Sequence, residues 1–181
     1  PVIRNNPLLC NSFITKTNKN CSKQNGIFNK TFNKDVFDKN GLCSEWVEEY
    51  YSISNKKVIR GLHFQLPPND HCKLVYCTSG KVFDVVLDLR SNSNTFCQFF
   101  TIELSAEKKN QLYIPEGMAH GFCALEDHST MIYKTSTVYS KDSDSGILWD
   151  SAGIEWPFSD QIISSRDKSF CKLKDFNSPF L

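Results

Sequence analysis

Between residues 43 and 139 the chain alternates short runs rich in β-branched and aromatic residues with short turns. Eight such runs are present, and they cover residues 44–53, 56–65, 72–80, 81–90, 95–105, 110–115, 120–126 and 129–139. Gly, Pro, Asn, Asp and Ser, the residue types that favour turns, concentrate between them, for example at residues 67–70 and 91–94. Many short strands at this spacing predict a mainly β fold, an antiparallel sandwich or jelly roll.

The segments that flank these runs are of a different kind. Residues 1–22 are polar and lack clear periodicity, so we expect a loose arm or an edge strand there. From Gly26 onward, apolar residues recur at helical spacing until Asn40-Gly41, which predicts a short helix that ends at this pair. We expect residues 23–181 to form one domain, whose last forty residues wrap the barrel as short helices and loops.

Charge and hydropathy exclude several classes of partner. The formal net charge is +1, so no strong overall field favours nucleic acid or a membrane surface. No run of about eighteen apolar residues exists that could span a bilayer. The N-terminal residues lack the basic-then-apolar layout of a signal peptide, so we expect a cytoplasmic protein.

The eight cysteines do not follow a metal-binding or redox pattern. None forms CxxC, and no Cys/His cluster has the spacing of a zinc site. We expect reduced thiols that act as small core or surface residues. The alternative is a nucleophilic cysteine, for which Cys72, beside Lys73, is the best candidate.

Two neighbouring predicted strands carry ionisable side chains on one face. Strict alternation over residues 81–90 places Asp84, Asp88 and Arg90 on the same face as Val82 and Val86. Solvent exposure of that face is one explanation. Because Lys73 lies on the strand before it, we favour a polar lumen inside the barrel that binds a polar ligand.

Arg60, His63 and Lys73 fall within fourteen residues of each other on predicted strands. Arg60 and His63 are three apart, so a regular strand would point them to opposite faces, and Gly61 is where a bulge could re-aim one of them. Taken alone, Arg60 and Lys73 could be surface cations and His63 a core histidine. Together they suit a phosphate contact, a proton acceptor and a stabiliser of an oxyanion, respectively. The combination indicates proton abstraction next to a carbonyl on a phosphorylated substrate.

Several long motifs in order closely resemble the cofactor-independent nucleotide-sugar 3,5-epimerases of the RmlC type, dTDP-4-dehydrorhamnose 3,5-epimerases of the cupin class. The resemblance covers roughly residues 23–170. The motifs are RGLHFQ (60–65), CKLV (72–75), KVFDVVLDLR (81–90), ELSAEKKNQLYIPEGMAHGF (103–122), YKTSTVY (133–139), GILWD (146–150) and GIEWP (153–157). It implies a jelly-roll barrel, a nucleotide-sugar substrate, a homodimer, no cofactor and a place in cell-surface polysaccharide synthesis.

The resemblance also implies roles for individual residues. His63 matches the catalytic base, Asp167 the acid that orients it, Tyr133 the acid on the opposite face of the sugar, and Lys73 the group that steadies the enolate oxygen. Arg60 matches a diphosphate contact. The other expected substrate-binding residues are Phe28, Ser52, Gln65, Asp84, His120 and Tyr139.

The sequence departs from the family where the nucleotide is expected to bind. Asn25 stands in place of an arginine and Lys30 in place of a glutamate, while Glu48 and Tyr50 replace a glutamine and an asparagine. These changes leave the base open between thymine, cytosine and guanine. The sequence also leaves open the number of inverted centres and whether the sugar is a hexose or a heptose.

Three other functions compete with double epimerisation. A single-centre epimerase and a 3,4-ketoisomerase use the same barrel, and a non-catalytic sugar-binding module would keep it without the chemistry. A metal site is disfavoured because HFQ supplies one histidine where a metal-binding cupin would have an HxH pair.

Overall fold

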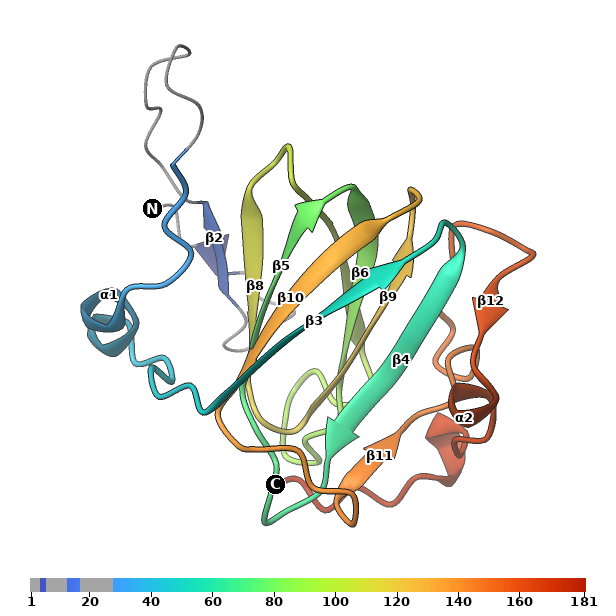
Figure 1. The fold of residues 1–181 in the computed structure, drawn as a ribbon. Helices are drawn as coiled ribbons and strands as arrows, with labels where there is room; N and C mark the ends of the chain where they lie inside the picture. Colours follow the sequence, from blue (N-terminus) through green and yellow to red (C-terminus); the bar gives the residue numbers. More distant parts are fainter. Residues whose placement is uncertain (1–3, 6–12, 17–27) are drawn as a thin grey trace.

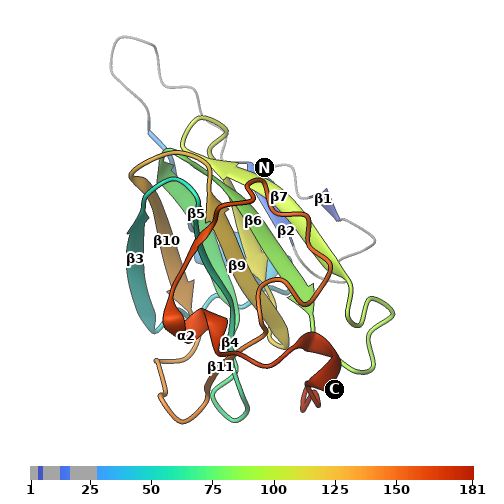
Figure 2. The ribbon, with the colours of Figure 1, turned by 90° about the vertical axis from the view of Figure 1, so that its right-hand side faces the viewer.

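Two six-stranded β-sheets face each other in the computed structural model, which describes residues 4–5, 13–16 and 28–181 (Figures 1 and 2). In the first sheet the strand order is β1-β2-β8-β5-β10-β3, and in the second it is β11-β4-β9-β6-β7, with β12 parallel to β4. All other strand pairs are antiparallel. The architecture is the predicted mainly β jelly roll, although in the described part of the chain the two sheets are hydrogen-bonded separately rather than as one closed barrel.

All eight strands expected from the sequence are present. The first sheet contains β1 (Arg4–Asn5), β2 (Phe13–Lys16), β3 (Glu48–Ser54), β5 (Lys73–Ser79), β8 (Asn110–Ile114) and β10 (Ser129–Thr135). The second contains β4 (Val58–Gln65), β6 (Lys81–Asp88), β7 (Phe99–Ser105), β9 (Met118–Ala124), β11 (Asp144–Gly146) and β12 (Ile162–Ile163). Most of the observed strands are shorter than the sequence runs because turn residues occupy the ends of those runs, whereas β9 begins two residues before its run and ends two residues earlier. Since β2 pairs with β8, part of the N-terminal region is an edge of the first sheet.

The helices are few and short: α1 (Lys34–Lys39), α2 (Ser165–Lys168) and the 3₁₀ turn η1 (Leu173–Asp175). The predicted first helix was too long, because the Asn33 side chain accepts a hydrogen bond from the Val36 N–H and caps the helix there. Its predicted end is confirmed, since Asn40 is the C-cap and Gly41 follows at φ +66°. None of the described helices is long and apolar enough to cross a membrane.

The main core lies between the sheets. Its buried residues are Val75, Cys77, Val82, Val86, Leu104, Leu112, Ile114, Met118, Phe122, Ala124, Met131 and Tyr133. They alternate with outward-facing residues along each strand, as the pleat requires. Where β4 and β9 face β3, β5 and β10, polar side chains replace this apolar core, and the sheets enclose a pocket there.

The outer faces of both sheets are also covered. The C-terminal segment packs Ile147, Ile154 and Phe180 against the outer face of the second sheet, which confirms the predicted wrap (Figure 2). On the first sheet, Phe37 of α1 packs with Leu74. Because the second sheet is buried on both faces, its strands read as nearly continuous apolar runs.

One expectation about the polar face of β6 was wrong. Asp84 lies inside between the sheets, but Asp88 and Arg90 do not belong to the lumen. β6 ends at Asp88, and this carboxylate binds Arg90 Nη2 at 2.7 Å and the hydroxyls of Ser93 and Thr95 at 2.7 Å each. The ion pair therefore holds the loop that leads to β7, where the chain turns away from the strand.

Candidate active site

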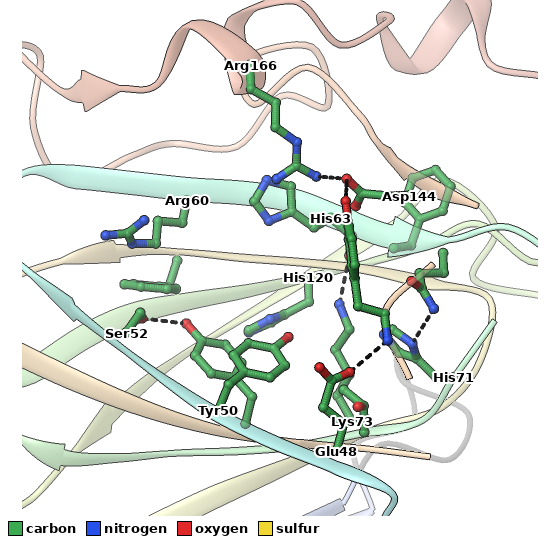
Figure 3. Close-up of a pocket in the computed structure, with 16 residues that line it drawn as sticks. Glu48, Tyr50, Ser52, Arg60, His63, His71, Lys73, His120, Asp144 and Arg166 are labelled. Carbon is green, nitrogen blue, oxygen red and sulfur yellow. Dashed lines mark hydrogen bonds and ion pairs between the residues drawn. The ribbon is translucent and has the colours of Figure 1, made fainter. Parts of the chain in front are cut away.

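A cavity of about 370 Å³ opens between the two sheets (Figure 3). One wall is formed by β4 and β9 of the second sheet and the other by β3, β5 and β10 of the first. Its lining residues are Glu48, Tyr50, Ser52, Arg60, His63, Phe64, Gln65, His71, Lys73, His120, Phe122, Tyr133, Thr135, Tyr139, Asp144 and Arg166. Eight of the eleven predicted site residues are in this set, and Asp167 and Asp84 lie directly behind His63 and His120.

A bulge in β4 explains how Arg60 and His63 reach the same pocket. The pairing of β4 with β9 shifts register between these two residues, and Gly61 lies within the shift at φ +130°. A Cβ on Gly61 would lie 2.5 Å from Gly121 Cα, so only glycine fits. The predicted bulge is confirmed.

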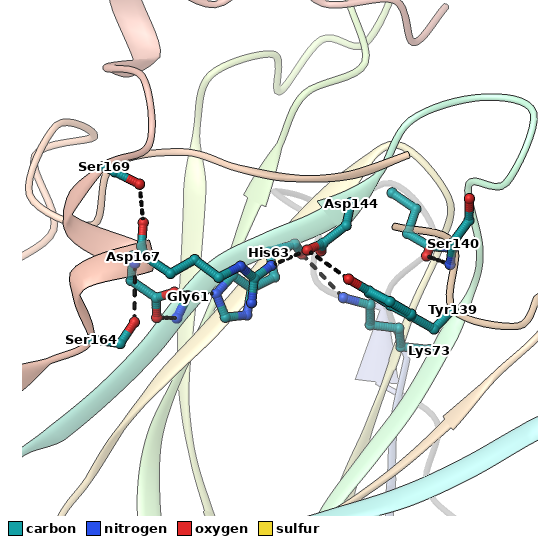
Figure 4. Close-up of polar contacts among 11 residues, drawn as sticks. Gly61, His63, Lys73, Tyr139, Ser140, Asp144, Ser164, Asp167 and Ser169 are labelled. Carbon is teal, nitrogen blue, oxygen red and sulfur yellow. Dashed lines mark hydrogen bonds and ion pairs between the residues drawn. The ribbon is translucent and has the colours of Figure 1, made fainter. Parts of the chain in front are cut away.

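His63 and Asp167 form a hydrogen-bonded pair at the bulge (Figure 4). His63 Nε2 lies 2.8 Å from Asp167 Oδ1, and the Gly61 N–H donates to Asp167 Oδ2 at 3.1 Å. Ser164 caps α2 by accepting a bond from the Asp167 N–H, which fixes the carboxylate at the start of this helix. Because an ionised carboxylate only accepts, Nε2 carries the hydrogen and Nδ1 is left as the basic nitrogen.

Opposing effects set the pKa values of this pair. Burial lowers the pKa of His63 below its ordinary value, although the Asp167 carboxylate partly opposes the shift. Burial alone would raise the pKa of Asp167, but its bonds to His63, Gly61 and Ser164 outweigh that effect and lower it. Near neutral pH the pair is therefore a neutral imidazole held by a carboxylate, which is the state that a general base requires.

Lys73 extends from β5 into the same space. It is 6% exposed, and its Nζ donates to the His63 backbone carbonyl at 3.1 Å. Burial lowers the pKa of Lys73 to about 8, while Asp144 and Asp84 oppose the shift. A partly desolvated ammonium in this position can stabilise negative charge that develops on a bound oxygen.

Tyr133 faces the pocket from β10, on the sheet opposite His63. Its hydroxyl lies 3.0 Å from Ser52 Oγ, and its ring stacks on Tyr50 with centroids 4.8 Å apart and planes 14° apart. The His120 ring meets it edge-on at 6.2 Å. Burial raises the pKa of Tyr133 far above its usual range, so the phenol is protonated and can act only as an acid.

His120 and Asp84 form a second buried pair. His120 Nε2 lies 2.9 Å from Asp84 Oδ2, and the two residues are 4% and 0% exposed. Burial raises the pKa of Asp84, and His120 partly offsets the shift. Asp84 Oδ1 is buried and has no hydrogen-bond partner among the described residues. His120 lines the pocket and Asp84 lies behind it, so the carboxylate orients the imidazole.

Arg60 and Gln65 both line the pocket, and Arg60 lies at one end of it (Figure 3). Arg60 is exposed, and its Nε donates to Ser54 Oγ at 3.0 Å. Gln65 is buried: its amide group donates to the Asn69 carbonyl at 2.7 Å and accepts from the Ser140 N–H at 2.6 Å. Gln65 therefore joins two loops as well as lining the pocket.

Two residues at the mouth of the pocket, Arg166 and Asp144, were not among the eleven predicted site residues. Arg166 Nη2 binds Asp144 Oδ2 at 2.5 Å, and the hydroxyl of the exposed Tyr139 donates to the same oxygen at 3.4 Å. The acidic stretch before the GILWD motif was the available signal for Asp144. Glu48 accepts the Tyr139 backbone N–H at 2.7 Å, which ties the loop after β10 to β3.

The remaining predicted positions lie away from this pocket or outside the described residues. Phe28 is 65% exposed and does not line the pocket. Lys30 is likewise exposed, and Asn25 lies outside the described residues. Glu48 and Tyr50, by contrast, line the pocket.

The alternative of a nucleophilic Cys72 does not agree with the structure. Cys72 is 6% exposed and accepts a hydrogen bond from the Tyr113 hydroxyl at 3.0 Å, outside the pocket. Burial raises the pKa of this thiol to about 12. A nucleophilic cysteine needs a lowered pKa, so Cys72 is a packing residue.

Comparison with known proteins agrees with this geometry. The sequence model of the family described as dTDP-4-dehydrorhamnose 3,5-epimerase matches residues 10–175, so the match begins within the N-terminal region that we had expected to fall outside it. The enzyme of that name from Shigella flexneri is 46% identical over 155 residues, which are 84% of this chain and 86% of the relative. The one from Methanothermobacter thermautotrophicus is 41% identical over 84% of each chain.

Solved structures give the same result. The Legionella pneumophila epimerase in complex with dTDP-4-keto-L-rhamnose has a TM-score of 0.92 and 30% identity, and covers 99% of this chain and 98% of its own. The Bacillus anthracis dTDP-4-dehydrorhamnose 3,5-epimerase, with TDP and PPi bound, has a TM-score of 0.91 and 34% identity over 95% and 99% of the two chains. The jelly roll and its histidine–aspartate pair opposite a tyrosine agree with this extensive sequence similarity. The chain therefore belongs to the dTDP-4-dehydrorhamnose 3,5-epimerase family of isomerases.

Proposed function

We propose that this protein inverts C3 and C5 of a dTDP-linked 4-keto-6-deoxyhexose without a redox cofactor, as a step in the synthesis of cell-surface polysaccharide. One observation carries the proposal. A neutral histidine held by a carboxylate and a protonated tyrosine project from opposite sheets into one pocket, with a buried lysine beside them. A site that only binds sugar needs no base and acid on facing walls.

The chemistry follows from the acidity of a hydrogen next to a ketone. His63 Nδ1 removes the proton from one face of the sugar, and the electrons move to the C4 oxygen as an enolate. The Lys73 ammonium stabilises this charge where it develops. The Tyr133 hydroxyl then returns a proton to the opposite face, so the centre is inverted.

The nucleotide is proposed from relatives and from the charge at the pocket mouth. The similar enzymes are named for dTDP sugars, and the Bacillus anthracis structure contains TDP. Arg60, exposed at one end of the pocket, suits a diphosphate. Glu48 and Tyr50 line the same pocket, so CDP- and GDP-linked sugars are the alternatives in a substrate panel.

The number of inverted centres needs its own test, because the fold does not decide it. A 3'-monoepimerase from Streptomyces bikiniensis shares the fold at 23% identity and a TM-score of 0.84. We favour inversion at both centres because Tyr133 faces the base across the pocket. The experiment is to run the reaction on dTDP-4-keto-6-deoxyglucose in D₂O and to weigh the product.

Two deuterons that do not exchange further mean inversion at both centres, and one means a single-centre epimerase. A product whose carbonyl has moved to C3 means a 3,4-ketoisomerase. Absence of deuterium uptake and of product, with every nucleotide in the panel, would overturn the enzymatic proposal.

We also propose a homodimer in the cytoplasm, where nucleotide sugars are made. β3 is the last strand of the first sheet, and Val47, Tyr51 and Ile53 on or beside it are 58%, 66% and 54% exposed. An exposed apolar edge strand is suited to pairing with a second copy across a two-fold axis. Light scattering should give twice 20.7 kDa at micromolar concentration, and the mass of one chain would contradict this.

A further inference from the structure

We propose that Ser52 is a proton-relay residue that reprotonates Tyr133 while the sugar is still bound, so that one tyrosine serves both inversions. The inference rests on the proposed function. Among the described residues, Ser52 is the one protein group that hydrogen-bonds the Tyr133 hydroxyl, at 3.0 Å. Either hydroxyl can be the donor in this contact, so the pair can pass a proton in either direction.

The proton balance creates the need for a relay. Each inversion moves one proton from carbon to His63 and one from the Tyr133 O–H to carbon, which leaves an imidazolium and a phenolate. The imidazolium can lose its proton to water, because the His63 side chain is 27% exposed. The phenolate must gain a proton before it can act as an acid at the second centre.

Water has poor access to Tyr133 from elsewhere. The residue is 7% exposed, Tyr50 is stacked on its ring at 4.8 Å, and the His120 ring lies at 6.2 Å. A sugar in the pocket would cover the side of Tyr133 that faces the cavity. During double inversion, bulk water is therefore excluded from the phenolate at the moment when it needs a proton.

Ser52 connects this buried oxygen to the wetter end of the pocket. It lies on β3, the outermost strand of the first sheet, and is only half-buried. It also lines the pocket together with the exposed Arg60. Ser52 Oγ can give its hydrogen to the phenolate as it accepts one from a water molecule at this end. The step restores both hydroxyls, and the hydroxide left by the water is neutralised by the proton that the His63 imidazolium releases to solvent.

The relay makes double inversion possible within a single binding event. Without it, the phenolate is reprotonated only after the sugar leaves, and the second centre must wait for rebinding. Loss of the Ser52 hydroxyl therefore slows the second inversion more than the first and changes the distribution of products. A purely structural or substrate-binding role for Ser52 would slow both inversions alike.

The test compares Ser52→Ala with Ser52→Thr, which keeps a hydroxyl, and with Thr130→Val, which removes one from β10 outside the pocket. Each protein is loaded with dTDP-4-keto-6-deoxyglucose, and excess dTDP is added at the start of the reaction so that released sugar cannot rebind. The ratio of doubly to singly inverted product is then measured by mass after reaction in D₂O. This ratio does not depend on the fraction of active protein.

We expect Ser52→Ala to lower the ratio by about 10²-fold, the low end of the contribution of a positioned proton-transfer group, because the second inversion is slowed more than the first. Ser52→Thr should restore most of the ratio, and Thr130→Val should leave it unchanged. An unchanged ratio in Ser52→Ala, or an equal loss of both inversions, overturns the relay. A wild-type protein that performs no inversion overturns the proposed function instead.

A wild type that inverts one centre only would also overturn the relay, because a single inversion needs no reprotonation of Tyr133 while the sugar is bound.

Discussion

His63 Nε2 lies 2.8 Å from Asp167 Oδ1, although 104 residues separate the two side chains in the sequence. The bulge at Gly61 makes the contact possible, because it turns His63 into the pocket and frees the Gly61 N–H to bind the other carboxylate oxygen at 3.1 Å. Asp167 is thus held by the histidine it orients and by the backbone next to that histidine.

Replacement of His63 by Asn should lower the rate by about 10²–10⁴-fold, the usual contribution of a general base, and should leave dTDP affinity nearly unchanged. Deuterium exchange at both C3 and C5 should fall together, because the same nitrogen removes both protons. In the wild type, burial lowers the pKa of His63, so activity should persist below pH 6.5 and fall only as pH drops through the lowered value. Near-normal exchange in the variant would rule out His63 as the base.

Lys73 should make the rate fall at alkaline pH. Burial lowers its pKa to about 8, and the enolate is stabilised by the ammonium, which exists below that value. The rate of the wild type should therefore decrease as pH rises through about 8. Lys73→Met should be slower by about 10²–10³-fold, as when an oxyanion donor is lost, and should lack this decrease. Lys108→Met, which removes an exposed lysine paired with Glu103, is the control and should keep the wild-type pH profile.

Gly61→Ala should destabilise the fold, and the effect should exceed that of a glycine with free space around it. A Cβ at Gly61 would lie 2.5 Å from Gly121 Cα and 2.9 Å from the His120 carbonyl oxygen, at φ +130°. Steric overlap and backbone strain together should cost about 2–6 kcal/mol of unfolding free energy. Gly153→Ala has a similar backbone constraint, at φ +75°, but nothing within 4 Å, and should cost about 1 kcal/mol. Urea unfolding of both variants checks the difference, and equal costs would show that the close packing at the bulge is not rigid.

The sequence predicted the strands well because each strand carries its own local signal. Alternation along residues 81–90 correctly separated the face that contains Asp84 from the face covered by the C-terminal segment. The same pattern failed at Asp88, because alternation says nothing about where a strand ends, and the chain turns there to make the ion pair with Arg90. Gly61 was recognisable as a bulge because the spacing of Arg60 and His63 required one.

Pairing between distant segments could not be read from local pattern. The positions of Asp167 behind His63 and of Tyr133 opposite it were expected only from resemblance to the family. Asp144 and Arg166, which meet at the pocket mouth, lie on the short elements β11 and α2, whose positions depend on packing against the second sheet. The placement of such short elements is set by tertiary contacts rather than by the propensities of their own residues.

Tyr133→Phe should separate proton removal from inversion. His63 is unaffected by the change, so recovered substrate should still gain deuterium from D₂O at C3, while completed inversion should fall by about 10²–10⁴-fold with the loss of the acid. Tyr76→Phe on β5, a tyrosine outside the pocket, is the matched control and should keep both activities. If exchange and inversion fell together in Tyr133→Phe, the tyrosine would instead be needed for binding or for the base.

Tyr50 should matter through its ring and not through its hydroxyl. The Tyr50 ring is stacked on the Tyr133 ring, with centroids 4.8 Å apart. Because Tyr50 is 44% exposed, it covers Tyr133 on the side that faces solvent. Tyr50→Phe keeps the stack and should leave the ratio of inversion to exchange close to that of the wild type. Tyr50→Ala removes it and should lower this ratio by roughly 2- to 12-fold, the equivalent of the 0.5–1.5 kcal/mol that an aromatic pair contributes. The two rates are measured together by mass and by NMR in D₂O, so partial unfolding would lower both and leave their ratio unchanged. An equal loss in the Phe and Ala variants would show instead that the Tyr50 hydroxyl takes part, and an unchanged ratio in Tyr50→Ala would show that the stack is not needed to position Tyr133.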